Sequence, residues 1–185
     1  MYTFKKVCVT NRHLTDRPLY EQIKVVFAIS KPDIVILREK DLSEDEYREL
    51  AYKVKLLCDL YSVRLIVNKY YKVARELGTT VQLPINDYES NVRSLNGLSV
   101  WVSVHSLQEA IRAEESSVNA IIAGHIYETD CKRGLPGRGI EFLTSIVEQV
   151  DVPVYAIGGI DEFNIEEVAS TGASGACQMS FYMNL

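Results

Sequence analysis

Short apolar runs alternate with longer amphipathic segments along the whole chain. The short runs are rich in Val, Ile and Leu and end at Gly, Pro or charged residues, a pattern typical of buried strands. The predicted strands are Lys6–Thr10, Ile34–Leu37, Arg64–Val67, Val81–Leu83, Ser99–Val104, Ala120–Ala123, Pro153–Ile157 and Ala173–Phe181.

The longer segments place apolar residues three or four positions apart, which predicts amphipathic helices. Two of them begin with capping boxes, Ser43 with Glu46 and Ser106 with Glu109, in which the two side chains satisfy backbone N–H groups at the helix start. The predicted helices are Pro18–Ile29, a helix from behind Ser43 to Cys58, Tyr70–Leu77, Glu89–Leu95, Leu107–Glu115, Ile140–Gln149 and Phe163–Ser170.

Eight predicted strands with seven intervening helices are the count of a (β/α)8 TIM barrel. No linker, repeat or low-complexity segment interrupts the alternation, so residues 1–185 are expected to form a single domain. The chain stops at Leu185, directly after the eighth predicted strand, so the barrel is expected to lack its last outer helix. Either a neighbouring subunit of a homo-oligomer then covers strands eight and one, or the barrel is distorted there.

Composition and charge narrow the class of protein. With 47% hydrophobic and 24% charged residues the chain is globular, and its net charge of -5 opposes nucleic-acid binding, which needs clustered Lys and Arg. No run of ~18 apolar residues predicts a membrane span, and no signal-peptide pattern opens the chain. The four cysteines are scattered without a CxxC pair, which favours reduced thiols over zinc or disulfides; only Cys131 falls near a candidate site. We therefore expect a cytoplasmic protein.

Polar and basic residues follow several of the predicted strands. In a TIM barrel these positions converge on one mouth, and a basic mouth on an acidic protein suits a small anionic ligand. Simpler structural interpretations stay open, because His13 can be an exposed loop residue, His105 can flank a helix cap, and a strand end can carry solvated cations. The candidate residues at the mouth are His13, Arg38, Lys40, Asn68, His105, His125 and Lys132.

Two further features predict chemistry at this mouth. Gly158, Gly159 and Ser180 follow strands seven and eight, where barrels bind phosphate through backbone N–H groups that glycine leaves accessible. His125 stands where strand six breaks into polar residues, and an imidazole at a rim is suited to moving protons near neutral pH. That role requires a ring beside a cavity and fails for a ring packed into the core. No metal-ligand spacing and no nucleophile-base pair is apparent, so we expect no metal and no cofactor.

The same residues resemble those of a known family. GHIYETDCKRGLPGRGI at residues 124–140 is similar to the signature of the TenI proteins, thiazole tautomerases related to thiamine phosphate synthase. The stretches ILREK, VQLP, VSVHSLQEA and AIGGI occur in the order of that family, so the resemblance covers nearly the whole chain.

The TenI resemblance implies an isomerase without a metal, which aromatises a carboxythiazole phosphate tautomer during thiamine biosynthesis. His125 occupies the catalytic histidine position of the family. The resemblance further implies that Arg38, Lys40 and Lys132 face the carboxylate of the substrate and that Gly159 and Ser180 face its phosphate, with Asn68 in the pocket wall.

Two alternatives remain open. Thiamine phosphate synthases hold magnesium on a pyrimidine pyrophosphate with an INDR motif after strand three and an acidic residue after strand four. This chain has Lys69 in place of the Asp of that motif, and a lysine repels the ion. The other alternative is a catalytically silent, TenI-like protein that binds a ligand or regulates.

Overall fold

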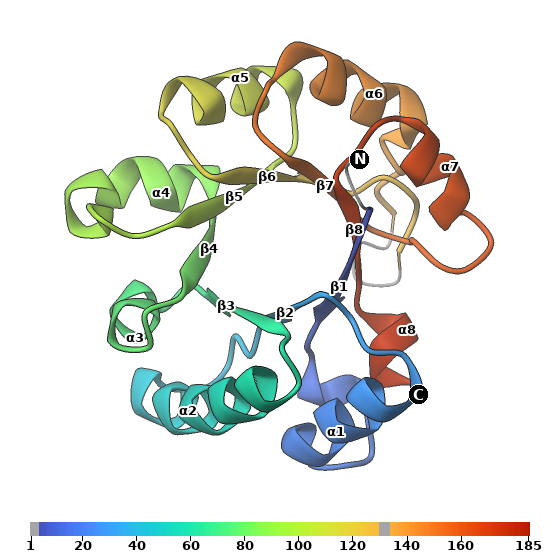
Figure 1. The fold of residues 1–185 in the computed structure, drawn as a ribbon. Helices are drawn as coiled ribbons and strands as arrows, with labels where there is room; N and C mark the ends of the chain where they lie inside the picture. Colours follow the sequence, from blue (N-terminus) through green and yellow to red (C-terminus); the bar gives the residue numbers. More distant parts are fainter. Residues whose placement is uncertain (1–3, 130–133) are drawn as a thin grey trace.

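The computed structural model describes residues 4–129 and 134–185, and within them eight parallel strands close into a barrel in the order β1 to β8 (Figure 1). Every strand pairs with its sequence neighbours, and β8 closes the ring on β1 through pairs such as Val7 with Cys177. The expected TIM barrel is confirmed. The strands are β1 Lys5–Val9, β2 Ile34–Leu37, β3 Arg64–Asn68, β4 Thr80–Pro84, β5 Val100–Val104, β6 Ala120–Gly124, β7 Val154–Ile157 and β8 Gly175–Gln178.

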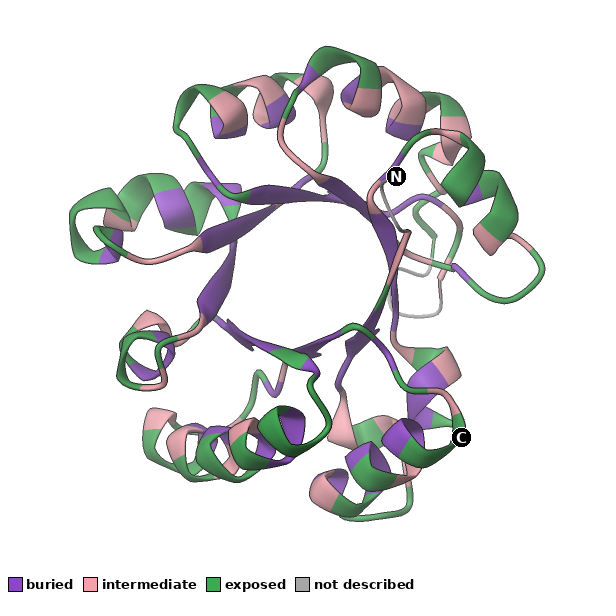
Figure 2. Ribbon diagram, viewed as in Figure 1, coloured by how far each residue is buried: buried purple, intermediate pink, exposed green. Residues whose placement is uncertain are grey.

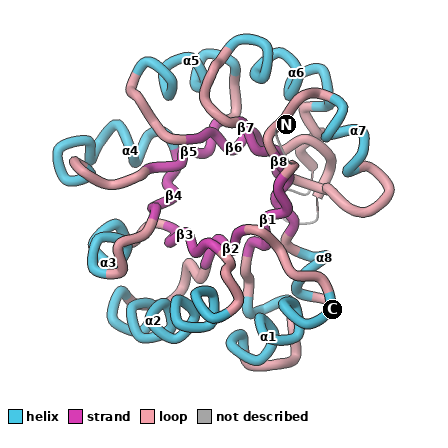
Figure 3. Tube along the Cα trace, viewed as in Figure 1, coloured by secondary structure: helices cyan, strands magenta, loops and turns pink. Residues whose placement is uncertain are grey.

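Helices form an outer ring around the strands, as the tube in Figure 3 makes plain. The capping box at Ser43 forms as expected, with both reciprocal hydrogen bonds to Glu46. The helices are α1 Leu19–Ile29, α2 Glu44–Leu60, α3 Tyr71–Glu76, α4 Ile85–Asn91, α5 Leu107–Glu115, α6 Gly139–Gln149, α7 Ile165–Ser170 and α8 Ser180–Met183, with short 3-10 segments η1 Arg12–Leu14 and η2 Val92–Leu95.

The core has two layers, because strand residues point alternately into the barrel and toward the helices. Both strand faces are buried around the ring (Figure 2). In the barrel interior, the rings of Trp101 and Tyr155 stack with their centroids 4.3 Å apart. The other interior residues of this layer are Val7, Val9, Ile34, Ile36, Ile66, Ala120, Ile122 and Cys177.

The end of the chain resolves the question of the last helix. Strand β8 ends at Gln178, earlier than the predicted Phe181, and a single helical turn, α8, takes the place of a full outer helix. Tyr182 and Met183 of this turn are buried, and the side chain of Gln22 on α1 donates a hydrogen bond to the Tyr182 carbonyl at 3.0 Å. The chain therefore covers this part of the barrel itself, with α8 beside α1 in Figure 1.

One helix begins earlier than the sequence pattern predicts. The prediction placed a helix at Glu89–Leu95, whereas α4 starts at Ile85, directly after Pro84, and η2 follows it. Pro84 ends β4 and supplies a fixed backbone angle before the first helical turn. Among the helices that the structure describes, none has both the length and the apolar composition of a membrane span.

Candidate functional site

A chain of hydrogen-bonded polar side chains, buried at Asn68 and Gln82 and half-buried at Ser103, crosses the ends of three neighbouring strands. By alternation from the interior residues Ile66 and Trp101, Asn68 and Ser103 point into the barrel. The Asn68 amide donates to Gln82 Oε1 at 2.5 Å, and the Gln82 amide donates to Ser103 Oγ at 2.8 Å. The β3 to β5 side of the mouth is therefore lined with oriented amides and a hydroxyl, groups that recognise the polar edge of a heteroaromatic ring.

Tyr47 of α2 holds the ends of β2 and β3 together beneath this chain. Its buried hydroxyl donates to the Leu37 carbonyl at 2.6 Å and accepts from the Asn68 N–H at 3.0 Å, and burial raises the pKa of this phenol. The side chain thus satisfies two backbone groups at the base of the site.

Tyr47→Phe is expected to lower the free energy of unfolding by about 1–3 kcal/mol, because two buried backbone groups lose their partner while the ring volume stays. Urea denaturation measures the change. Tyr52→Phe, on the exposed side of the same helix, is the matched control and should alter stability by less than about 0.5 kcal/mol. Equal losses in the two variants would show that the paired hydroxyl contributes nothing specific.

A carboxylate cluster organises the β1 and β2 side of the mouth. Glu39 is 2% exposed, and it accepts hydrogen bonds from the Thr10 hydroxyl at 2.7 Å and from the Arg12 backbone and guanidinium. Thr10 Oγ1 also accepts from the Arg38 N–H at 2.9 Å. Arg38, which is half-buried, and Lys40, which is exposed, flank the buried Glu39 in the segment that follows β2.

His13 is part of this cluster and belongs to an ion-pair arrangement. Its Nε2 lies 3.0 Å from Asp41 Oδ2, and Arg12 binds the same carboxylate with two nitrogens at 2.8 and 2.6 Å. The hydrogen bond to His13, together with Arg12, lowers the pKa of Asp41. The structure therefore gives His13 a carboxylate partner on the protein surface.

His105 follows β5 at the rim, as expected. Its Nδ1 lies 2.7 Å from the Gly124 carbonyl, which can only accept, so Nδ1 carries the proton in the neutral ring and Nε2 carries the lone pair. The backbone N–H of His105 donates to Glu109, the residue that also donates its N–H to the Ser106 cap. The ring is thereby held in one orientation across the ends of β5 and β6.

His125 lies deeper than the sequence pattern predicts. The residue is 6% exposed, and its Nε2 donates to the Pro136 carbonyl at 3.0 Å, which leaves the lone pair on Nδ1. Among the described residues that buried Nδ1 has no hydrogen-bond partner. The expected solvent-facing ring is instead enclosed by the loop that follows β6, because the main chain of that loop folds back over it.

Gly158 and Gly159 lie directly under the same loop. A Cβ on Gly158 would stand 2.5 Å from His125 Cβ, and a Cβ on Gly159 would stand 2.6 Å from the Glu128 carbonyl oxygen. The loop is tied to this turn by the hydrogen bonds from Ile126 N to the Ile157 carbonyl and from Tyr127 N to the Gly158 carbonyl. Because Gly158 and Gly159 have no side chains, the main chain of the loop after β6 packs directly against this turn.

Of the remaining candidates, two lie within the described residues and two lie outside them. Ser180 is exposed at the first position of α8, past the end of β8, and Asn68 is buried in the amide chain described above. Lys132 and Cys131 fall outside the described residues.

Sequence reasoning missed the buried Glu39 cluster and Asp87. Asp87 is a carboxylate in the first turn of α4, and its place three residues after β4 was a usable signal.

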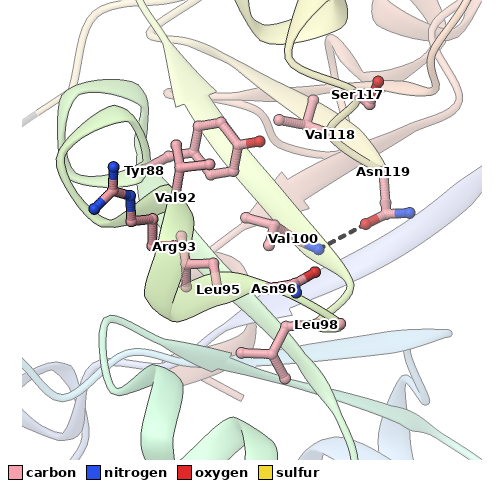
Figure 4. A pocket seen from close by; sticks show the side chains of 11 residues that line it. Tyr88, Val92, Arg93, Leu95, Asn96, Leu98, Val100, Ser117, Val118 and Asn119 are labelled. Atoms are coloured by element: carbon pink, nitrogen blue, oxygen red, sulfur yellow. Dashed lines mark hydrogen bonds between the residues drawn. The ribbon is translucent and has the colours of Figure 1, made fainter.

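Two hollows lie at the opposite end of the barrel. One, of about 560 Å³, is lined by residues such as Tyr88, Arg93 and Asn119, at the amino-terminal ends of β5 and β6 (Figure 4). Two of its polar groups are hydrogen-bonded within the fold, since Asn119 Oδ1 accepts from Val100 N at 2.7 Å and the Tyr88 hydroxyl donates to the Ser116 carbonyl. In TIM barrels this end serves stability and the strand carboxyl ends serve chemistry.

Comparison with known proteins now decides the family. The family described as thiamine monophosphate synthase, which includes the TenI proteins, matches residues 6–181. The chain belongs to this family. Thiamine-phosphate synthase of Clostridium acetobutylicum is 32% identical over 182 residues, which cover 96% of this chain and 86% of that protein. Thiamine-phosphate synthase of Pyrococcus abyssi is 33% identical over 175 residues, covering 92% of this chain and 84% of that protein.

Solved structures of the thiamine monophosphate synthase family agree with the fold. Thiamine phosphate pyrophosphorylase from Pyrococcus furiosus superposes with a TM-score of 0.84 at 29% identity, covering 98% of this chain and 88% of that one. A 3-hexulose-6-phosphate synthase, at 13% identity and a TM-score of 0.67, shares the barrel alone.

These relatives correct the expectation of an isomerase. They are named thiamine-phosphate synthases, which are transferases, so the isomerase assignment drawn from the TenI signature is wrong. The position of His125 agrees with rejecting the isomerase assignment, because the ring nitrogen without a hydrogen-bond partner, Nδ1, is buried and closed to solvent.

The residues at the mouth do not fit the magnesium site of thiamine phosphate synthases. Lys69 stands after β3 with a positive φ of 70°, and its Nζ lies 5.1 Å from the centre of the Tyr70 ring. Asp87 is the first carboxylate after β4 in the sequence, and the described residues hold no group of three or more His, Cys, Asp or Glu side chains able to bind a metal. An ammonium in place of a metal-binding carboxylate repels a divalent cation and attracts an anion.

Proposed function

We propose that this protein couples a pyrimidine pyrophosphate to a thiazole phosphate, the reaction for which its relatives are named. In this coupling the thiazole nitrogen bonds to the methylene carbon of the pyrimidine, and the bond from that carbon to the pyrophosphate oxygen breaks. The pyrophosphate leaves with both bonding electrons, so the site must stabilise an anion.

The observation that supports the proposal is the row of cations across neighbouring strand ends. Arg38 and Lys40 follow β2 on either side of the buried Glu39, and Lys69 follows β3. All three belong to the rim of a barrel whose chain carries a net charge of -5. Because Lys69 replaces the acidic metal ligand of the synthases, side-chain cations are proposed to neutralise the pyrophosphate directly.

The buried amide chain supplies the other half of the proposed site. Asn68, Gln82 and Ser103 are held in fixed orientations by their mutual hydrogen bonds, so they can receive a heteroaromatic ring without reorganising. Such preorganisation aligns the methylene carbon with the incoming nitrogen, which is the main protein contribution to a displacement of this type.

A coupling assay with purified protein tests the proposal. Pyrimidine pyrophosphate and thiazole phosphate are expected to yield thiamine phosphate and pyrophosphate in equal amounts, and the rate should change less than about twofold when a chelator replaces magnesium. A coupling rate that falls to background with the chelator would contradict the role given to the cations. Absence of product under both conditions would exclude the synthase proposal as a whole.

A second candidate function is favoured by Lys69 and by the contacts of the loop after β6 with Gly158 and Gly159. A family member without a carboxylate metal site, and with a protein loop seated against Gly158 and Gly159, could bind a phosphorylated thiazole without turning it over. Isothermal titration with thiazole phosphate separates the two candidates. Saturable binding without release of pyrophosphate from the second substrate would favour the binding protein.

A further inference from the structure

The second of the two hollows at the amino-terminal end of the barrel is lined by arginines that no carboxylate neutralises. Its volume is about 500 Å³, which lies within the range of small-molecule sites. Arg64, the first residue of β3, and Arg75, in the last turn of α3, both line it. Among the residues that the structure describes, neither guanidinium forms an ion pair with an Asp or Glu side chain.

The Arg64 side chain is held in place by neutral groups. Its Nη2 donates to Thr80 Oγ1 at 2.6 Å, and its guanidinium carbon lies 5.5 Å from the centre of the Trp101 ring. A guanidinium has five N–H donors, so four of them have no acceptor in the described part of the chain. A cation that is already oriented can bind an anion with little further loss of side-chain entropy.

The Arg75 side chain is held by main-chain carbonyls. Its Nη2 donates to the Ser94 carbonyl at 2.8 Å and to the Asn96 carbonyl at 3.2 Å, and its Nη1 donates to the Asn96 carbonyl at 3.2 Å. Three of the five N–H donors are used in this way, and the Nε hydrogen and one Nη1 hydrogen have no acceptor among the described residues. The carbonyls orient the guanidinium and leave its charge uncompensated.

The acidic residue in the lining is already paired. Both carboxylate oxygens of Asp59 accept from Lys55 Nζ, and these two residues line the same hollow. Their charges cancel, so the two arginines give the hollow a local excess of positive charge on a chain whose net charge is -5. Gly97 adds open space to the wall, because a Cβ there would meet no atom within 4 Å. The hollow therefore has the charge and the room for an anion.

We propose that this hollow, which we call the amino-terminal anion site, binds a small phosphorylated molecule. A phosphate group has at least three acceptor oxygens, and the N–H forks of arginine match its geometry in a bidentate way. Because Arg64 and Arg75 belong to different elements, they can bind separate oxygens of one phosphate. A carboxylate has two acceptor oxygens and would leave more of the unused N–H donors without a partner.

The amino-terminal anion site is separate from the mouth of the barrel. Arg64 opens β3 and Lys69 follows its last residue, so ~13 Å of strand lies between the two positions. The proposed coupling reaction takes place at the mouth, and phosphate binding at the other end does not depend on it. Failure of either proposal leaves the other standing.

Titration of the isotope-labelled full chain with inorganic phosphate, followed by amide NMR shifts, tests the proposal. The amides of Gly78, Thr79 and Gly97, which line the hollow, are expected to shift together and to saturate. Potassium chloride of equal ionic strength should not reproduce these shifts. Shifts confined to residues at the mouth, or no saturating shift at tens of millimolar phosphate, would overturn the proposal.

Substitution of each arginine tests the two proposed contacts. Arg64→Gln and Arg75→Gln are each expected to weaken phosphate binding at this site at least ~10-fold, because charge-assisted hydrogen bonds are lost. Arg93→Gln is the matched control, since it makes the same change in charge in the neighbouring hollow (Figure 4). It should change the affinity less than about twofold.

Equal losses in Arg64→Gln and Arg93→Gln would show that only the overall charge matters and would reject the site. The amide spectrum of each variant also reports whether it is folded. Arg64 is exposed and a glutamine amide can still reach Thr80, so Arg64→Gln should keep the fold. If Arg75→Gln unfolds because two carbonyls lose their donor, the result with Arg64→Gln decides alone.

Discussion

Gly158→Ala is expected to lower the free energy of unfolding by about 3–5 kcal/mol, enough to leave little folded protein at physiological temperature. Gly158 has a φ of +110°, a backbone conformation that an alanine adopts only with strain. The added Cβ would also stand 2.5 Å from His125 Cβ and 2.9 Å from its Cα, so main chain must move. Urea denaturation followed by circular dichroism measures the loss.

Gly97→Ala separates the two causes of this loss. Gly97 also has a positive φ, of 78°, but a Cβ there would meet no atom within 4 Å. This control carries the backbone strain alone and should cost about 1–2 kcal/mol. A similar loss in both variants would show that the β6 to α6 loop does not depend on its close contact with Gly158.

Lys69→Asp is expected to make pyrophosphate binding dependent on magnesium. Two unit charges ~7 Å apart interact by about 2 kcal/mol at an effective dielectric constant of ~20, so reversing the charge at this position should weaken metal-free binding at least ~10-fold after screening by salt. Magnesium should restore the affinity, since the new carboxylate and Asp87 then supply oxygen ligands near adjacent strand ends. Aspartate tolerates the positive φ of this position better than most residues, so the variant should fold.

Isothermal titration with inorganic pyrophosphate, with magnesium or with a chelator, measures this effect. Lys72→Asp is the matched control, because it makes the same change in charge at an exposed position of α3. It should alter pyrophosphate affinity less than about twofold under either condition. If Lys72→Asp weakens binding as much as Lys69→Asp, only the overall charge of the protein matters and Lys69 has no place in the anion site.

Local patterns predicted the order of the elements because each depends on residues close together in sequence. The cap at Ser43 needs only Glu46, and the strand Ile34–Leu37 is recognisable from four consecutive apolar residues. The boundary of β8 was harder to place, because the apolar run continues past Gln178 while the backbone changes from strand to helix. Hydrophobicity alone carries no signal for that change.

The candidate site was predictable in its location and less so in its details. Sequence placed Arg38, Asn68 and His105 at strand ends, and the barrel gathers those ends into one mouth. The hydrogen-bond partners that orient them lie far away in the chain: Glu39 binds Thr10, and Asn68 binds Gln82. Such pairs depend on the register between strands, which residue patterns along one strand do not contain.

The amino-acid sequence by itself determined the alternation of strands and helices, the family, and the types of side chain that follow each strand. Only the tertiary structure decided which of those side chains are accessible. His125 follows β6 and is expected from the sequence to be an open rim position, yet the loop after β6 folds onto the turn after β7 and buries it, while Gly158 of that turn is half-buried and Gly159 exposed. Exposure is a property of what packs above a residue, and that segment comes from another part of the chain.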